Sequence, residues 1–400
     1  MNRLFAVLLC LSTIPTHASD WRQFRGPQGT GVSDETQLPT TLDAKKNLAW
    51  KIALPGRGLS SPIIVGDRVF VTCSSGSNQD RLHVICFNAA DGSKRWERQF
   101  WATGRTTCHE KISVAAPTSA SDGERIFALF SSNDLFCLDL DGNLLWLRGL
   151  MRDYPNASNG LGLASSPVVV DGVLVTQIET DSEAFVAGID VATGLNRWKI
   201  ERPKKANWTS PLLVRGANGK MVVALQASTG ITAIDPSTGV ELWKYTEGAS
   251  TVPSSAVRGD TLYVPSNGIT ALQTSSDGAP FKQLWRANHL RPATASPIVV
   301  EDRILTLNDA GVLNCGDTVE GKRLWQLRLK GPFSATPLAA GHFLYLVNEK
   351  GLAQVVDLSK PEGEITGELD LGEPIIGTPS IGGGGIYFRS DGHLWKIQKS

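Results

Sequence analysis

The sequence lacks any block of charge of one sign. Its 400 residues carry 39 Lys and Arg against 39 Asp and Glu, and the two kinds are interspersed along the chain. Proteins that bind nucleic acid concentrate basic residues on one face or along one helix. The sequence therefore predicts no nucleic-acid partner.

Cysteine is sparse and irregularly spaced. Beyond Cys10, the chain has only five cysteines, with no adjacent pair and no Cys-x-x-Cys motif: Cys73, Cys86, Cys108, Cys137 and Cys315. This odd number excludes a disulfide framework, and the spacing offers no zinc site or haem attachment. Cys73 and Cys86 fall on neighbouring expected strands, so a disulfide between them stays open, although two unpaired buried thiols are favoured.

Long apolar runs are absent except at the start of the chain. Arg3 precedes an apolar run over residues 4–11, and the small-residue site Thr16-His17-Ala18 follows. The run is far shorter than the roughly 20 residues that cross a bilayer. The pattern predicts a signal peptide over residues 1–18, cleaved near Ala18, no transmembrane segment, and an exported protein that is periplasmic or extracellular.

What the sequence does contain is a repeat. A Pro that usually follows a small residue, and is itself followed by a short β-branched stretch, recurs every 40 to 55 residues: Pro62, Pro117, Pro167, Pro211, Pro253, Pro297, Pro337 and Pro379. Hairpin turns follow most of these marks, and each unit tends to end in a Gly-containing turn and a Trp, as at Trp96, Trp146 and Trp198. Four short strands at this period predict the blades of a β-propeller.

The two ends of the chain complement each other. The eighth repeat supplies only three strands before the chain stops, whereas the segment around Trp50 is a Trp strand with no three strands before it. The segment near Trp50 should therefore pair beside Trp395 and close the ring, which removes unpaired sheet edges. We expect an all-β protein: a single eight-bladed propeller of four-stranded antiparallel blades over residues 47–400, preceded by a leader segment over residues 19–46.

The repeat phrases carry a resemblance to a known family. The stretches Ser-Pro-Val-Val-Val-Asp-Gly at residues 166–172 and Asp-Val-Ala-Thr-Gly-Leu-Asn-Arg-Trp at residues 190–198 are similar to the pyrroloquinoline-quinone-like repeat. Quinoprotein alcohol dehydrogenases and BamB-like exported bacterial proteins share this repeat. The resemblance covers residues 47–400 and implies the fold rather than the function.

The resemblance also implies a quinone cofactor, but the cysteine pattern of this chain argues against it. Quinoprotein dehydrogenases hold pyrroloquinoline quinone over a calcium ion in the axial channel, beneath a ring formed by two adjacent, disulfide-linked cysteines. This chain has no Cys-Cys pair and no haem motif. We therefore expect no cofactor, and the quinone with calcium is kept as the alternative.

Loop length indicates where a site would lie. From the Trp to the next repeat Pro the chain takes 21 residues after Trp96 and again after Trp146, against 10 to 13 elsewhere. Such connectors, and those between second and third strands, emerge on one face of a propeller, where long loops often carry function. The predicted ligand-binding or partner-binding residues on this face are Arg105, His109, Lys111, Tyr154, Asn156, Asn159, Asp181, Arg202 and Trp208.

No catalytic or metal-binding residue is predicted among them. A lone His109 could act as a base or a ligand, but a structural role is favoured. Cys108 and His109 are adjacent on the chain and should point apart, which disfavours a thiolate pair. Asp181 and its acidic neighbours lack the spacing of a calcium loop.

These observations favour a non-catalytic binding or assembly scaffold of the bacterial cell envelope. Its partner, an envelope protein or an extracellular ligand, would bind the enlarged-loop face, and we expect a monomer. The alternative function is an oxidoreductase that depends on pyrroloquinoline quinone or a metal and has its site at the mouth of the channel.

Overall fold

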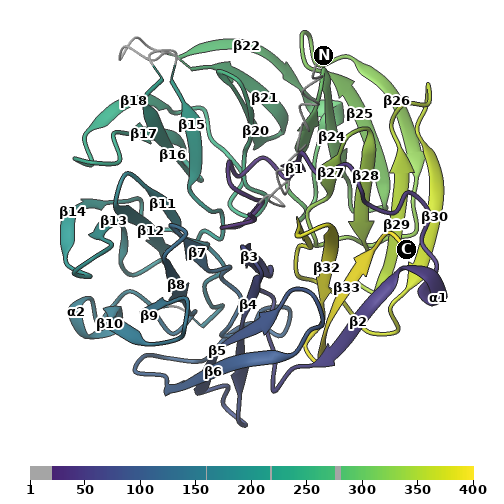
Figure 1. The fold of residues 1–400 in the computed structure, drawn as a ribbon. Coiled ribbons are helices and arrows are strands. Elements are labelled where there is room, and N and C mark those ends of the chain that lie inside the picture. The colour runs from purple at the N-terminus through teal and green to yellow at the C-terminus, as the bar shows by residue number, and fades with distance from the viewer. Residues whose placement is uncertain (1–19, 159, 217–218, 275–280) are drawn as a thin grey trace, which may run out of the picture.

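A computed structural model describes residues 20–400 except 159, 217–218 and 275–280. Eight sheets surround one axis and close into a ring, as Figure 1 shows. Each sheet is a blade in which consecutive strands pair antiparallel, with the first strand at the centre and the fourth at the rim. The predicted eight-bladed, all-β propeller is confirmed.

Each of blades 1 to 4 consists of four consecutive strands. Their strands are β3 (Ile63–Val65), β4 (Arg68–Ser75), β5 (Arg81–Asn88) and β6 (Lys94–Trp101) in blade 1; β7 (Ala120–Ser121), β8 (Arg125–Leu129), β9 (Asp134–Asp139) and β10 (Leu144–Gly149) in blade 2; β11 (Val168–Val170), β12 (Val173–Glu179), β13 (Ala184–Asp190) and β14 (Asn196–Glu201) in blade 3; and β15 (Leu212–Arg215), β16 (Met221–Ala227), β17 (Gly230–Ile234) and β18 (Glu241–Tyr245) in blade 4.

Blades 5 to 8 complete the ring. Their strands are β19 (Ala256–Arg258), β20 (Thr261–Ser266), β21 (Gly268–Gln273) and β22 (Lys282–Ala287) in blade 5; β23 (Ile298–Val300), β24 (Arg303–Leu307), β25 (Val312–Asp317) and β26 (Arg323–Arg328) in blade 6; β27 (Leu338–Ala340), β28 (Phe343–Val347), β29 (Leu352–Asp357) and β30 (Glu364–Asp370) in blade 7; and β31 (Ser380–Gly382), β32 (Gly385–Arg389), β33 (His393–Gln398) and β2 (Leu48–Ala53) in blade 8. The short helices are α1 (Ala44–Asn47), α2 (Leu150–Asp153) and the 3-10 turn η1 (Asn288–Leu290).

The ring closes as the sequence predicts. Strand β2 pairs antiparallel with β33, with Lys51 opposite Trp395, so the N-terminal strand supplies the fourth strand of the last blade. One blade departs from the expected four strands. A two-residue strand of the leader, β1 (Val32–Ser33), pairs parallel with β27, Val32 opposite Ala339, and makes blade 7 five-stranded. The innermost strand of a blade has an unpaired edge at the channel, and the leader satisfies it there.

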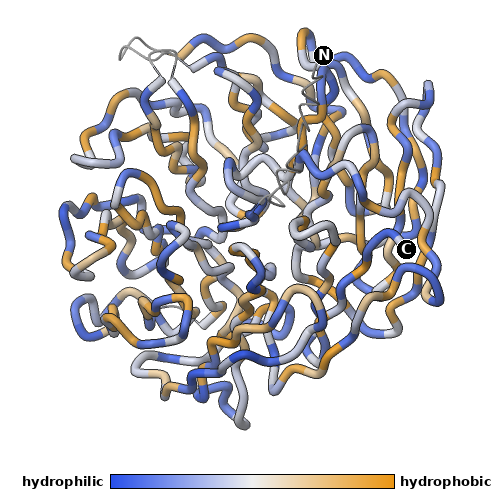
Figure 2. The backbone as a smooth tube through the Cα atoms, viewed as in Figure 1, coloured by the Kyte–Doolittle hydropathy of each residue, from blue (hydrophilic) through white to orange (hydrophobic). Residues whose placement is uncertain are grey.

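Hydrophobic residues run along the strands of the blades, and hydrophilic ones lie in turns and on outer strands (Figure 2). The apolar side chains of the strands are buried. The repeated Trp residues dock onto the neighbouring blade. Trp146 Nε1 donates to Val191 O at 3.0 Å, and a Cβ added to Gly194 would lie 2.8 Å from its indole. Only glycine, at φ +73°, both fits this turn and admits the indole. The same Trp-on-Gly contact recurs at Trp50, Trp96, Trp198, Trp285 and Trp325.

All five cysteines in the described part of the chain are free thiols. Cys73 lies opposite His83, and Cys86 opposite Phe70, so the two are not cross-strand partners. The favoured expectation of two unpaired, buried thiols is confirmed.

The leader crosses one end of the channel. In Figure 1 its purple trace lies over the centre of the ring. Trp21 exchanges two backbone hydrogen bonds of 2.9 Å with Ile64 of blade 1, and Ser121 of blade 2 donates to Arg22 O. On the far side of the axis, the Arg25 guanidinium donates to Ser255 O at 2.7 Å and to Pro297 O at 2.9 Å. The leader thus bridges blades that lie on opposite sides of the ring before β1 joins blade 7.

No helix among the described residues is long and apolar enough to span a bilayer. The predicted signal peptide, residues 1–18, lies outside the described part of the chain.

Candidate functional site

The axis of the ring holds a cavity of about 440 Å³. Every blade contributes to its wall, and Phe24 of the leader contributes from the end that the leader crosses. The exposed lining residues, such as Lys111, Leu161 and Val252, all come from connectors between a fourth strand and the next first strand. The cavity is therefore closed by the leader and opens toward the enlarged loops.

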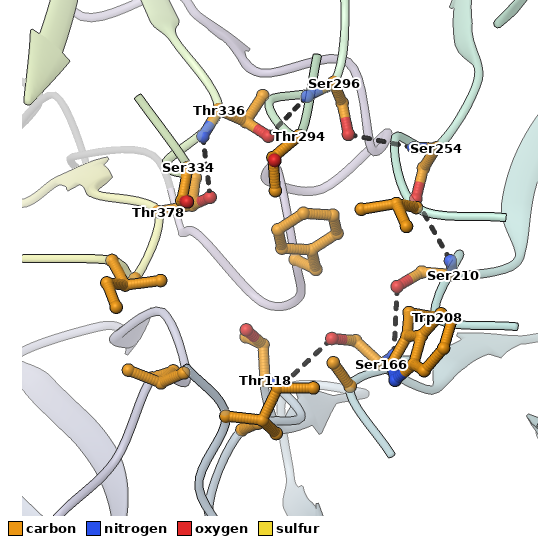
Figure 3. Close-up of a pocket in the computed structure, with 18 of the residues that line it drawn as sticks. Thr118, Ser166, Trp208, Ser210, Ser254, Thr294, Ser296, Ser334, Thr336 and Thr378 are labelled. Carbon is orange, nitrogen blue, oxygen red and sulfur yellow. Dashed lines mark hydrogen bonds between the residues drawn. The ribbon is translucent and has the colours of Figure 1, made fainter. Parts of the chain in front are cut away.

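A ring of hydroxyl groups, one from each blade, surrounds this cavity (Figure 3). We call it the hydroxyl ring; its members are Ser61, Thr118, Ser166, Ser210, Ser254, Ser296, Thr336 and Thr378. Around the ring, the backbone N–H of each residue donates to the hydroxyl oxygen of the next, at 2.9 to 3.2 Å, in seven consecutive bonds from Ser61 to Thr378. Each of these hydroxyls thereby ties two neighbouring blades together at the axis.

The position of the hydroxyl explains a detail of the repeat. In six repeats it belongs to the residue immediately before the repeat Pro. In the two repeats that have Ala116 or Val252 there, the residue after the Pro supplies it instead, as Thr118 and Ser254. Two different sequence positions therefore place a hydroxyl at one spatial position.

The ring has one break, at the seam where blade 8 meets blade 1. Ser61 donates its N–H to Thr118, but its Oγ has no hydrogen-bond partner among the described residues, although only 2% of Ser61 is exposed. Burying a hydroxyl without a partner costs about 1–3 kcal/mol. This hydroxyl in the cavity wall can therefore gain stability by forming a hydrogen bond with a ligand.

A second ring lies nearer the mouth, two residues before each member of the first. This upper ring comprises Leu59, Ala116, Ala164, Trp208, Val252, Thr294, Ser334 and Ile376. Alternate residues of an extended chain share one face, so both members of each pair face the axis. Six of the eight are apolar. The wall of the cavity thus changes from hydroxyl groups at the closed end to mainly apolar groups toward the mouth.

The two enlarged loops meet at the mouth. His109 N, in the loop after blade 1, donates to Leu161 O in the loop after blade 2 at 3.1 Å. From the first loop, Lys111 Nζ reaches across to Glu349 Oε2 in blade 7 at 3.4 Å, and Ser334 also donates to that carboxylate. The expectation that both loops lie on one rim agrees with this arrangement.

Three of the predicted site residues line the cavity: His109, Lys111 and Trp208. Trp208 Nε1 donates to Gly162 O at 3.0 Å, which fixes the indole in the wall. His109 and Lys111 lie in the first enlarged loop, where the loop length predicted a site.

Two other predicted residues have structural contacts away from the cavity. Arg202 forms a buried ion pair with Glu179 at 2.7 Å and also donates to Thr232, so it links blades 3 and 4. Tyr154 packs against Phe185 with the rings tilted by 51° and 4.4 Å between ring centroids. Loop length does not reveal whether a polar side chain folds back into the protein.

Three further predicted residues lie outside the cavity wall. Arg105, Asn156 and Asp181 are exposed on loops, and Asp181 accepts a hydrogen bond from Ala206 N at 3.1 Å. Asn159 lies outside the described residues.

Sequence reasoning missed most of the wall. A Ser or Thr stands immediately before the Pro in six of the eight repeats, and this recurrence was the available signal for the hydroxyl ring. Phe24 gave no signal, because its position depends on the path of the leader across the axis.

The wall of the cavity is made of hydroxyl and apolar side chains with His109 and Lys111 at the mouth. Among the described residues that line the cavity there is no carboxylate and no cysteine, and the described chain has no group of three or more His, Cys, Asp or Glu that could hold a metal. Cys108 lies beside the mouth, but burial raises the pKa of its thiol. A thiol with a raised pKa stays protonated and is a poor nucleophile.

Comparisons with known proteins agree with this architecture. A family model described as outer membrane protein assembly factor BamB matches residues 31–216, 186–281 and 277–366. The chain is 24% identical over 386 residues to the outer membrane protein assembly factor BamB of Burkholderia pseudomallei, covering 88% of this chain and 89% of that protein. It is 25% identical over 270 residues to a polyvinylalcohol dehydrogenase of a Sphingopyxis species, covering 56% of this chain and 39% of that enzyme.

Among solved structures, the quinohemoprotein alcohol dehydrogenase of Comamonas testosteroni superposes with a TM-score of 0.70 at 14% identity, covering 95% of this chain and 81% of that one. At this identity the likeness shows the fold alone.

Proposed function

The chain belongs to the pyrroloquinoline-quinone-like repeat β-propeller family that includes BamB, and on that premise we propose that it is an exported, non-catalytic scaffold that binds an envelope protein at the mouth of its axial cavity. The relative named as an outer membrane assembly factor supports an envelope location and a protein partner. Its match extends over nearly the whole of both chains, whereas the dehydrogenase match covers less than half of the enzyme.

The observation that carries the proposal is the shape and chemistry of the cavity. It is closed by the leader, opens among the enlarged loops, and is lined by hydroxyl and apolar groups without a carboxylate among the described residues. Leu161 and Val252 leave 43% and 42% of their surface exposed at the mouth. Apolar side chains around a concave site are typical of the centre of a protein interface.

Site-specific photo-crosslinking in the native cell tests this function. A photoreactive phenylalanine derivative at Val252 should form one predominant adduct with an envelope protein. Val240 is the matched control, because it is 58% exposed but lies in a turn between third and fourth strands, on the opposite face. Equal adducts at both positions, or none at Val252, would contradict a partner at the mouth.

The alternative, a dehydrogenase that uses pyrroloquinoline quinone with calcium, draws support from the resemblance to polyvinylalcohol dehydrogenase. Calcium prefers carboxylate and carbonyl oxygens. The described lining residues supply no carboxylate side chain, so they do not fit a calcium-bound quinone. Equilibrium titration with the quinone and calcium, followed by metal analysis of the washed protein, distinguishes the two functions: stoichiometric retention of both would favour the enzyme.

A further inference from the structure

The hydroxyl ring presents hydrogen-bond donors to the cavity. Seven of its hydroxyl oxygens already accept a backbone N–H, and among the hydrogen bonds of the described residues none of these seven hydroxyls donates to another protein group. Each therefore keeps an O–H proton for a ligand. The Oγ of Ser61 has no hydrogen-bond partner within the described part of the chain and adds an eighth group. A ligand that brings several hydrogen-bond acceptors can use all of these protons.

The charge of the wall also favours a ligand that carries hydrogen-bond acceptors, because it favours an anion. Lys111 is the one charged side chain among the described lining residues, and 61% of its side chain is exposed. The Lys111 ammonium attracts an anion and repels a second cation, although Glu349, to which both Lys111 and Ser334 are bound at the mouth, offsets part of that charge. The bond from Lys111 to Glu349 is long and exposed, so an incoming anion can replace it at little cost.

The upper ring and the closed end of the cavity favour a ligand that has an apolar part next to its anionic group. Trp208, Leu59 and Val252 line the wall above the hydroxyl ring, and Phe24 lies at the closed end. Because the leader closes the cavity at one end, a polypeptide cannot thread through it; the end of a chain enters as one strand, whereas a loop must enter as two.

We infer that the cavity binds the free C-terminus of a partner protein whose last residues are apolar. The terminal carboxylate accepts from the hydroxyl ring, and the last side chains pack against the upper ring. A C-terminus brings acceptors and a negative charge at its end, whereas an N-terminal ammonium brings three donors and a positive charge, which Lys111 opposes. This inference rests on the proposed scaffold function and names the part of the partner that is bound.

Titration calorimetry of the purified protein with short peptides tests the inference. The probe is acetylated alanyl-leucyl-phenylalanine, used as the free acid and as the C-terminal amide. We expect the free acid to bind at least tenfold more tightly, because the amide loses the negative charge and introduces donors. Equal affinities, or no binding of the free acid at millimolar concentration, would overturn the inference.

A small organic acid shares this chemistry, so a third compound separates the two sources. 3-Phenylpropionate has the carboxylate and the aromatic side chain but no peptide. It should bind at least tenfold more weakly than the free-acid peptide, since it leaves most of the upper ring uncovered. Equal affinity would assign the cavity to small organic acids and reject the peptide.

Three variants place the peptide in the cavity. Val252→Trp should abolish binding by filling the mouth, while Val240→Trp, the same change on the opposite face, should not alter it. Ser61→Ala removes a donor without leaving a backbone N–H unpaired, because the Oγ of Ser61 accepts no bond; a loss of about threefold or more in affinity is expected. Peptide affinity unchanged by Val252→Trp would place the site elsewhere and reject the inference.

The crosslinking experiment tests the scaffold function, and the peptide experiment tests the bound element, so each can give a negative result without the other. An adduct at Val252 in cells, together with equal binding of acid and amide, would keep the scaffold function and reject the C-terminus as the bound element. Absence of the adduct would reject the scaffold function itself.

Discussion

The two ends of the channel are built from different kinds of interaction. At the leader end, charged and aromatic groups are buried: Arg25 is 2% exposed and Trp21 1% exposed. Burial lowers the pKa of Arg25 to about 10, and only backbone carbonyls accept its hydrogen bonds. At the mouth, 61% of the Lys111 side chain is exposed, and the side chains of the Arg57–Asp391 pair are 40% and 47% exposed.

This difference separates stability from function. Removing a partner from a buried, hydrogen-bonded charge lowers the stability of a protein strongly. The leader end therefore contributes mainly to holding the blades together. Exposed ion pairs contribute little to stability and can change partners. The exposed pairs at the mouth are therefore free to change partners, and their substitution should affect unfolding far less than substitutions at the leader end.

The largest effect is expected at the leader end. Arg25→Ala should lower the free energy of unfolding by about 3 kcal/mol, because Ser255 O and Pro297 O lose charged donors in a buried site. Urea unfolding followed by fluorescence measures this change. Arg22→Ala is the control, since 42% of the Arg22 side chain is exposed and its ion pair with Asp20 is at the surface; its cost should stay below about 1 kcal/mol. Equal costs would remove the distinction between the two ends.

A smaller effect is expected at Gly26, which has φ +83° and lies under Trp21. A Cβ there would stand 2.8 Å from the Trp21 ring. Gly26→Ala should cost about 2 kcal/mol, from backbone strain plus the clash. Gly66→Ala, at φ +58° with open space around the new Cβ, isolates the strain alone and should cost about 1 kcal/mol. If the two variants unfold at the same urea concentration, Trp21 is not firmly packed against the leader.

The sequence predicted the ring better than either end of its channel. The repeat marks, the Trp phrases and the complementary ends at Trp50 and Trp395 are local patterns, and each copy reinforced the others. The leader has no repeat, and its path depends on contacts between Arg25 and residues more than 200 positions away. Loop length located His109 and Lys111, but it could not distinguish them from Arg202, whose partner Glu179 becomes buried only when the blade folds.

A still smaller effect on the free energy of unfolding, which depends on pH, is expected in blade 1. Burial raises the pKa of Glu97, but hydrogen bonds from Lys94, His83 and Gln99 outweigh it and hold this pKa at about 2. A depressed carboxyl pKa contributes stability above the unfolded value near 4.5, and that stability is lost as pH falls toward 2. Glu97→Gln should therefore cost about 1 kcal/mol at pH 7 and progressively less below pH 4.5.

The control for this pH dependence is Glu124→Gln. The Glu124 side chain is 85% exposed, and its nearest cation is 3.9 Å away. Unfolding midpoints in urea at pH 7, 4 and 3 should change little for this variant relative to the parent protein. A Glu97→Gln cost that is the same at all three pH values would show that the carboxylate charge does not matter there.

The smallest effect on stability is expected at the mouth. Lys111→Ala breaks a 3.4 Å pair in which 61% of the lysine side chain is exposed, so the free energy of unfolding should change by less than about 0.5 kcal/mol. Peptide affinity, in contrast, should fall several-fold and lose part of its salt dependence, because the cation that attracts the carboxylate is gone. A large loss of stability would mean that the bridge to Glu349 holds blades 1 and 7 together across the mouth. The mouth would then be a structural element like the leader end, and the separation of stability from binding along the channel would not hold.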